Sequence, residues 1–457
     1  MPWWKPRVVL TATVLAASGC ALPGPPAFAP TPGPANAPVV RTRPVPNPIV
    51  PASYQQPALQ ADAPPESIDD FVRLAVERNP RLARANLAID AARGRHLQAG
   101  LYPNPEVAIN WDELGDRSSP DRLGVLTAPR VTQTIVTGRK LTLAQAVAAR
   151  EVDQATLDLV AERYAVVGSV RSAFYETLTL QRRATLLAEQ VKLTEEAVAN
   201  GKTLLDAKQL TRLDMIQLEV DREQFRAELQ AVKRELSGAY RRLAAVAGAH
   251  AVVPVGVTGT FDGLPDYDAD SVRAAVVAYH PQARAAHVAV ARARAAVKRA
   301  EAEPIPNVSA YVGYIRQFEN KSHDGAVGFS VPVPVWNKNQ GNIRAAQAEL
   351  GMAVHAVGQT ENELAARVAT AFQSYAAARE RAEAYRKELI PRAEETYKLS
   401  LAAFKGGQFE YLKVIQVQRG LAEARLELNK SLGEAWKAAA ELSGLLLEDI
   451  WPAAPAK

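Results

Sequence analysis

The chain has 457 residues, a formal net charge of +5 and a composition rich in helix-favouring residues. Charges of both signs are mixed, and no basic stripe with interleaved aromatic residues is present, which argues against a nucleic-acid-binding protein. The single cysteine excludes an intrachain disulfide and a cysteine metal cluster.

The N-terminus predicts an export signal over residues 1–20. Lys5 and Arg7 precede an apolar run that is too short to cross a bilayer permanently, and Cys20 follows it. The position of Cys20 resembles a lipobox and predicts a lipidated mature N-terminus; the alternative is an ordinary secretory signal with an incidental cysteine. Residues 21–65 contain 14 prolines and predict an extended tether.

A pattern of 30 residues occurs twice in the remaining chain, at 78–107 and again at 279–308. Three proline pairs share one offset of 201, namely Pro80 with Pro281, Pro103 with Pro304, and Pro105 with Pro306. Repeats spaced this far apart are not solenoid units. The pattern therefore predicts two copies of a structural half, which we place at residues 66–250 and 268–447, with a linker at 251–267 and a tail at 448–457.

Each predicted half opens with a short helix, at about 68–78 and about 270–279. The pairs Asn79-Pro80 and His280-Pro281 end these helices, because the residue before a proline avoids the α region. Pro80 and Pro281 then start helices of about 20 residues, since proline suits a first helical position. We interpret His280, which takes the place of Asn79, as a helix cap rather than a metal ligand.

Two β-like stretches follow in each half, at 106–113 and 125–137, then at 307–317 and 326–336. Apolar residues alternate there, which predicts strands with one apolar face. The alternating positions are Val107, Ile109 and Trp111, then Val327, Phe329, Val331, Val333 and Val335.

Four strands are too few to close a useful barrel, and lipid does not tolerate open sheet edges. If these strands lie in a membrane, the chain must oligomerise, and a trimer of four-stranded chains would supply 12 strands. Four aromatic residues are candidates for interfacial girdles, with ordinary packing as the rival interpretation: Trp111, Tyr311, Tyr314 and Trp336.

Residues 138–200 and 341–390 contain no proline and predict very long helices. A helix of about 60 residues spans about 90 Å. In the return helix of the first half, apolar residues recur in steps of four and three, which predicts left-handed supercoiling with a partner helix. The positions are Phe225, Leu229, Val232, Leu236, Ala239, Leu243 and Val246.

Three motifs carry a family resemblance: VPVPVWNKNQGNIRAAQAEL at 331–350, VTQTIVTGRKLTLAQA at 131–146, and the helix at 404–428. Together with the duplicated Asn-Pro and His-Pro helix starts, they resemble TolC-type outer-membrane efflux proteins, in particular the cation and heavy-metal branch. The resemblance covers about residues 68–447.

This resemblance implies a mainly α fold with a small β part. Three chains would form a homotrimer whose 12-stranded β-barrel, four strands per chain, continues into a coiled-coil α-helical barrel. Such a protein lies in outer-membrane lipid, lipid-anchored here, and extends into the periplasm. Its partners would be a periplasmic adaptor (membrane fusion) protein and an inner-membrane RND-type pump. It would export small molecules or metal cations passively, with no enzymatic activity, cofactor or nucleic acid.

The motifs also predict structural roles at the strand-to-helix turns. We expect Gly138 and Gly341 to permit the turn where a β-carbon would clash. Pro332 and Pro334 remove ladder donors, so the last strand should pair incompletely near its end.

The family often carries carboxylates one helical turn apart at the tip of the last hairpin, where they form a periplasmic gate. The matching positions here are Lys413 and Gln416, and in the first half Asp214 and Gln217. Asp214, Glu410 and Lys413 could instead form an alternating salt-bridged iris, or all three could be ordinary solvated charges.

Two other functions compete with an export channel for small cargo. One is a non-conducting structural coiled-coil lipoprotein that spans the periplasm, and the other is the outer-membrane conduit of a type I protein secretion system. The two strand pairs favour a channel, because a scaffold has no need for lipid-facing alternating strands.

Overall fold

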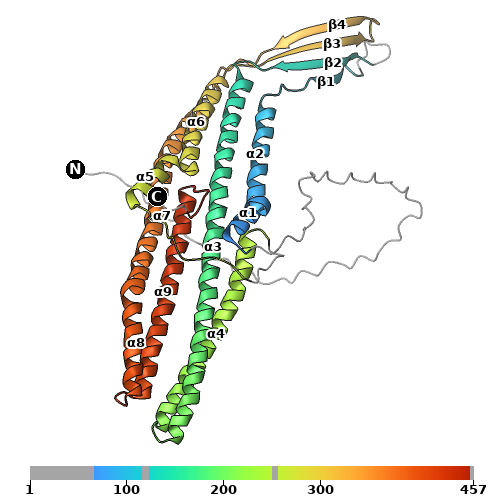
Figure 1. Ribbon diagram of the computed structural model, residues 1–457. Coiled ribbons are helices and arrows are strands. Elements are labelled where there is room, and N and C mark those ends of the chain that lie inside the picture. The colour runs from blue at the N-terminus through green and yellow to red at the C-terminus, as the bar shows by residue number, and fades with distance from the viewer. Residues whose placement is uncertain (1–65, 116–122, 250–255, 453–457) are drawn as a thin grey trace, which may run out of the picture. The chain divides into compact units, whose positions relative to one another are not determined.

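The computed structural model describes residues 66–115, 123–249 and 256–452 (Figure 1). The predicted signal segment, Cys20 and the proline-rich tether lie outside the described residues. All the elements given below belong to one compact unit, Ala61–Lys457.

The two halves contain the same order of elements, and the described chain is mainly α with one small sheet, as predicted. The first half consists of α1 (Ile68–Arg78), α2 (Pro80–Ala99), β1 (Glu106–Asp112), β2 (Val125–Ile135), α3 (Lys140–Asp206) and α4 (Arg212–Val246). The second consists of α5 (Ala269–Tyr279), α6 (Pro281–Ala302), β3 (Val308–Gln317), β4 (His323–Ser330), α7 (Gln340–Ala384), the π-helical turn η2 (Tyr385–Leu389), α8 (Ile390–Lys405) and α9 (Tyr411–Leu445).

The helices α2 and α6 start in the same way in both halves. Proline occupies the first helical turn in each, where its missing N–H removes no helical hydrogen bond. The Asn79 side chain accepts a hydrogen bond from the Arg81 N–H at 2.9 Å, and His280 Nδ1 accepts one from the Gln282 N–H at 3.2 Å. An imidazole thus replaces a carboxamide as the cap of the second repeat.

The four strands form one antiparallel sheet in the order β1-β2-β3-β4, so β1 and β4 are its edges. The prediction for the last strand, 326–336, is wrong at both ends, because β4 begins at His323 and ends at Ser330. Pro332 and Pro334 lie in the irregular segment that follows, where neither can donate to a ladder. Val331, Val333 and Val335 therefore belong to a connection and not to the strand.

The second long helix continues beyond the predicted limit at Ile390. A π-helical turn, η2, lies between α7 and α8, and the Ile390 N–H donates to the Tyr385 carbonyl. Pro391 follows immediately; it has no N–H, and in a regular helix its ring would press on the carbonyl four residues earlier. The wider π turn accommodates this proline and lets the helix continue to Lys405.

The long helices lie side by side in the order α4, α3, α9, α8 (Figure 1). The helix α3 also packs against α2 and α6, and α9 against α7. The predicted apolar stripe of α4 faces its neighbour, with Phe225, Leu229 and Val232 buried in a cluster with Leu187 and Val191 of α3. The apolar stripe predicted from the sequence is therefore the face of α4 that packs against α3.

The largest core lies where α1, α5 and the segments around 257–267 and 446–451 pack on the long helices. Its centre is the fully buried Trp436, which stacks on Tyr175 with 4.5 Å between ring centroids. The Trp436 indole N–H donates to the Phe261 carbonyl at 3.1 Å, so its polar atom is satisfied inside the core. Among the described residues, no helix is both long and apolar enough to cross a membrane.

Candidate functional site

The sheet has one strongly apolar face. Residues directly opposite each other in antiparallel strands share a face, and Val107, Val131, Val312 and Val327 form one such row across all four strands. Val327 is 84 % exposed and Phe329 81 %, so nothing within the described chain covers this face. The remaining members include Ile109, Trp111, Leu126, Ala310 and Tyr314, and the face also carries Gln133, Arg316 and His323.

The opposite face is mostly polar or small, with Val125 and Ile315 as apolar members near the hairpin end. The row formed by Glu106, Thr132, Tyr311 and Gly328 crosses the sheet there. Other residues on it are Ala108, Asn110, Asp112, Thr127, Arg130, Thr134, Ser309, Gly313, Asp324, Ala326 and Ser330. A sheet that is apolar on one side and polar on the other, with both edges free, is suited to separating lipid from water.

The aromatic residues do not form the single set that the girdle prediction required. Trp111 stacks on Phe318 at 6.3 Å, and Tyr314 contacts His323, both on the apolar face. Tyr311 lies on the polar face, so the girdle interpretation is wrong for this residue. Trp336 lies beyond the last strand and is 87 % exposed.

The strand-to-helix turns use left-handed residues. Gly138 has φ of +64°, and a β-carbon there would lie 3.1 Å from Ile305 Cβ. In the second repeat the prediction for Gly341 is wrong: a β-carbon on Gly341 would meet nothing within 4 Å, and the residue lies inside α7. The left-handed position there is Asn339, with φ of 59°. Asparagine tolerates this conformation better than most residues.

At the tip of the first hairpin, Asp214 forms a capping box with Thr211 at the start of α4. The Thr211 hydroxyl donates to the Asp214 carboxylate at 2.6 Å, and the Asp214 N–H donates to the Thr211 hydroxyl at 3.1 Å. One turn later, Gln217 Nε2 donates to Asp221 Oδ1 at 3.1 Å. The Asp214 carboxylate is thus engaged in its own helix start.

At the tip of the second hairpin, Glu410 is the N-cap residue of α9 but makes no capping hydrogen bond with its side chain. Its carboxylate lies 3.8 Å from the Lys413 ammonium, and both side chains are exposed. Gln416 follows one turn later and is also exposed. The structure therefore brings Glu410 and Lys413 together within one hairpin, while Asp214 belongs to the other.

A connection between the two hairpins was missed by sequence reasoning. Asp221 of α4 is 8 % exposed, and its Oδ1 lies 3.2 Å from Arg419 Nη1 of α9. The Arg419 Nε also donates to Glu423 at 2.9 Å. The signal was present in the sequence, because Asp221 interrupts the apolar stripe three residues after Leu218. A carboxylate at a core position requires a partner.

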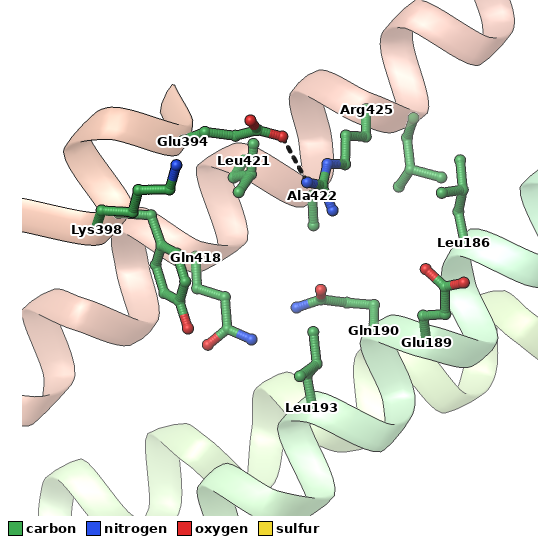
Figure 2. A pocket seen from close by; sticks show the side chains of 12 residues that line it. Leu186, Glu189, Gln190, Leu193, Glu394, Lys398, Gln418, Leu421, Ala422 and Arg425 are labelled. Atoms are coloured by element: carbon green, nitrogen blue, oxygen red, sulfur yellow. Dashed lines mark hydrogen bonds and ion pairs between the residues drawn. The ribbon is translucent and has the colours of Figure 1, made fainter. Parts of the chain in front are cut away.

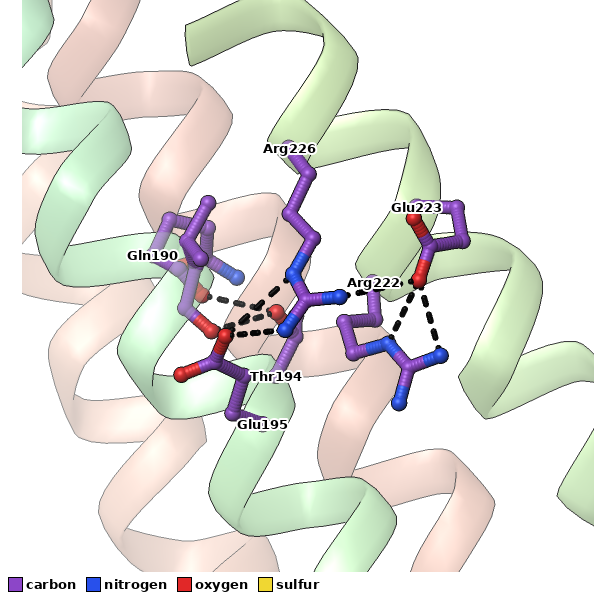
Figure 3. A network of polar contacts seen from close by, with 7 residues as sticks. Gln190, Thr194, Glu195, Arg222, Glu223 and Arg226 are labelled. Atoms are coloured by element: carbon purple, nitrogen blue, oxygen red, sulfur yellow. Dashed lines mark hydrogen bonds and ion pairs between the residues drawn. The ribbon is translucent and has the colours of Figure 1, made fainter.

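Ion pairs also join α3 to α4 within the first hairpin, as Figure 3 shows. The Arg226 guanidinium lies 2.6 Å from the Glu195 carboxylate and 3.2 Å from that of Glu223. The hydrogen bond that the Arg226 guanidinium donates to the Glu195 carboxylate is the main cause that raises the pKa of Arg226. These side chains are exposed, and pairs of this kind contribute little to stability.

A cavity of about 430 Å³ lies between α3 and the α8–α9 hairpin (Figure 2). Gln190, Leu193, Gln418 and Leu421 are among the side chains that line it, and an ion pair of 2.7 Å between Glu394 and Arg425 lies at its edge. Within the described residues, no group of three or more His, Cys, Asp or Glu side chains could hold a metal ion.

Comparison with known proteins agrees with this architecture. Residues 275–446, which lie within the predicted second repeat, match the family model described as outer membrane efflux protein. The chain has the fold of the outer membrane efflux proteins. The resemblance predicted from the sequence motifs is thereby confirmed.

The cobalt-zinc-cadmium resistance protein CzcC of Cupriavidus metallidurans is 24 % identical over 392 residues, which cover 84 % of this chain and 90 % of that relative. The solved structure of CusC superposes with a TM-score of 0.71 at 17 % identity, over 83 % of this chain and 91 % of that one. The outer membrane protein VceC from Vibrio cholerae gives a TM-score of 0.69 at 18 % identity, over 83 % and 95 %.

Proposed function

We propose that the chain is the outer-membrane channel of a tripartite efflux system for metal ions. One observation carries this proposal: a four-stranded sheet with an uncovered apolar face and a polar face stands at the end of paired helical hairpins. An exposed apolar face of this kind would favour aggregation in water. In lipid it is the stable surface, provided that the sheet closes.

Closure needs further copies of the chain, because β1 and β4 are free edges and one chain offers four strands. Pairing β4 of one copy with β1 of the next is a head-to-tail contact, and such contacts form a ring when the rotation between copies closes. Three copies would give a 12-stranded barrel, the size implied by the family. A scaffold without a channel would gain nothing from a sheet of this kind.

The helices flanking the sheet support the same ring. On one side, Leu97 in the last turn of α2 and Leu101 and Tyr102 just after it are 65, 50 and 63 % exposed. On the other, Trp336 and Met352 are 87 and 71 % exposed. These two apolar flanks continue from the two open sheet edges, so a head-to-tail ring would bury one against the other.

The hairpin tips supply a docking surface and a gate in this proposal. Leu213, Ile216 and Val220 form an exposed apolar stripe near the tip of α4, which suits a helical partner such as the periplasmic adaptor. That adaptor would link the channel to an inner-membrane RND-type pump. The gate would be formed by the polar tip side chains, namely Asp214, Gln217, Glu410, Lys413 and Gln416.

The similarity to CzcC supports metal ions as cargo, and lipidation of Cys20 would anchor the chain to the outer membrane. The proposal is tested by recording single-channel currents from purified protein in planar bilayers, and by measuring the growth of a deletion strain in cobalt, zinc and cadmium. We expect stepwise conductance and increased metal sensitivity. Absent conductance would contradict the channel, whereas unchanged metal sensitivity with normal conductance would contradict only the cargo.

A further inference from the structure

Arg130 is the one charged residue inside a strand rather than at a strand end, among the four described strands. It is the sixth of the eleven residues of β2. The other charged strand residues lie within two positions of a strand end: Glu106, Asp112, Arg316, His323 (when protonated) and Asp324.

The register places Arg130 on the polar face of the sheet. Its direct neighbours on that face are Ala108 of β1 and Gly313 of β3, and Ala326 of β4 continues the same row. Neither neighbour has a side chain that could cover or neutralise a guanidinium.

The guanidinium packs against the ring of Tyr311. Its Cζ is 4.0 Å from the centroid of the Tyr311 ring, which is a close cation–π contact. The Tyr311 ring in turn lies over Gly328, where a β-carbon would approach the phenol oxygen to 2.5 Å. Gly328 thus leaves the space in which the Tyr311 ring lies.

The charge of Arg130 is not neutralised by the described chain. No ion pair and no side-chain hydrogen bond of Arg130 forms with another described residue, and its Nε is buried without a hydrogen-bond partner. An arginine normally uses its five donors on carboxylates, carbonyls or phosphates. Here the donors beyond Nε remain available to whatever passes along the polar face.

We propose that Arg130, supported by Tyr311, forms a ring of three guanidinium groups that favours anions over cations at the middle of the barrel. This inference rests on the proposed function, because the polar face lines a pore only in the closed trimer. Rings of arginine or lysine select for anions in other pores by the same electrostatics. The carboxylates of Asp112 and Asp324 lie near the hairpin end of the sheet, away from Arg130. Glu106 lies on the same face in the neighbouring row, which it shares with Tyr311, but it forms no ion pair with Arg130 among the described residues.

The ring has a consequence for the cargo. A bare divalent cation would be repelled at the level of Arg130, whereas a small organic anion, or a metal ion carrying anionic ligands, would be attracted. The inferred substrate class for the strand region is therefore small anions, including anionic metal complexes.

The test is the reversal potential of the trimer in planar bilayers under a potassium chloride gradient. We expect Arg130→Gln to lower the ratio of chloride to potassium permeability by about threefold or more, and Arg130→Glu to lower it further. Arg130→Lys keeps the charge and should keep the wild-type ratio. Arg316→Gln is the matched control, because Arg316 also contacts an aromatic ring, with its Cζ 4.8 Å from the centroid of Phe318, but lies on the apolar face.

An unchanged permeability ratio in conducting Arg130→Gln trimers would overturn this inference and leave the channel intact. Equal shifts in Arg130→Gln and Arg316→Gln would also overturn it, because the effect would then not depend on the polar face. Absence of conductance in the wild-type protein would instead refute the proposed function and the inference with it.

Discussion

His280 makes the stability of the second repeat depend on pH in a way that can be separated from other groups. The side chain is 5 % exposed, and burial, with a smaller contribution from the charge of Arg367, lowers the pKa of His280 from 6.5 to about 4. A lowered pKa in the folded state means that the unfolded chain binds the proton more readily. The stabilisation is therefore complete above pH 6.5 and is lost as the pH falls toward 4.

The magnitude follows from the two pKa values. A difference of 6.5 − 4, or about 2.5 units, at 1.36 kcal/mol per unit gives about 3 kcal/mol per chain. The variant His280→Asn copies the Asn79 cap of the first repeat, so it should keep the cap at pH 7 and lose this dependence. We expect urea unfolding to show about 3 kcal/mol less destabilisation between pH 7 and pH 4 in the variant than in the wild type.

Comparison of the two proteins cancels the titration of the carboxylates, which both share. His280→Ala is a second control, because it removes the cap and should cost about 1 kcal/mol at pH 7 as well. If wild type and His280→Asn lose the same stability between pH 7 and pH 4, the buried neutral imidazole is not the source of acid sensitivity and the reasoning fails.

Three further predictions concern the sheet, the core and the hairpin tips. Val327→Arg on the apolar face should cost about 2–4 kcal/mol per chain in insertion into lipid vesicles, while Ala326→Arg on the polar face should insert like the wild type; equal insertion of the two would contradict the assignment of faces. Trp436→Ala should lower the free energy of unfolding by about 3–5 kcal/mol in urea titrations, because the indole is fully buried, and a loss near zero would argue against this core. Arg419→Gln leaves the Asp221 carboxylate without its cation and should speed amide hydrogen exchange in both hairpin tips, with a cost of about 2 kcal/mol after allowance for the partial exposure of Arg419; unchanged exchange at the tip of α4 would show that the pair does not join the hairpins.

Much of the fold was predictable because the spacing of apolar residues and the positions of prolines mark helices and strands in the sequence. The starts of α2 and α6 coincide with Pro80 and Pro281, since proline fixes φ and lacks the N–H that a first turn does not need. The buried stripe of α4 follows from the alternating steps of four and three. These features depend on neighbouring residues, which a sequence displays directly.

Other features depended on contacts that the sequence does not display. The end of β4 at Ser330 reflects the loss of donors at Pro332 and Pro334, but alternating valines continued the apparent strand past it. The π turn before Pro391 absorbs a residue that would ordinarily end a helix. The left-handed residue of the second turn is Asn339 and not the nearby Gly341. The stacking of Arg130 on Tyr311 joins two strands about 180 residues apart, so no local pattern could reveal it.

The oligomeric state of the detergent-extracted protein tests the central claim most directly. Closure of the sheet requires several copies of the chain, and native mass spectrometry should find three chains, about 148 kDa as three times 49.3 kDa before processing and lipidation. The assembly should separate into single chains on heating. A folded single chain as the sole species would leave the apolar face and both sheet edges uncovered, and would contradict the account.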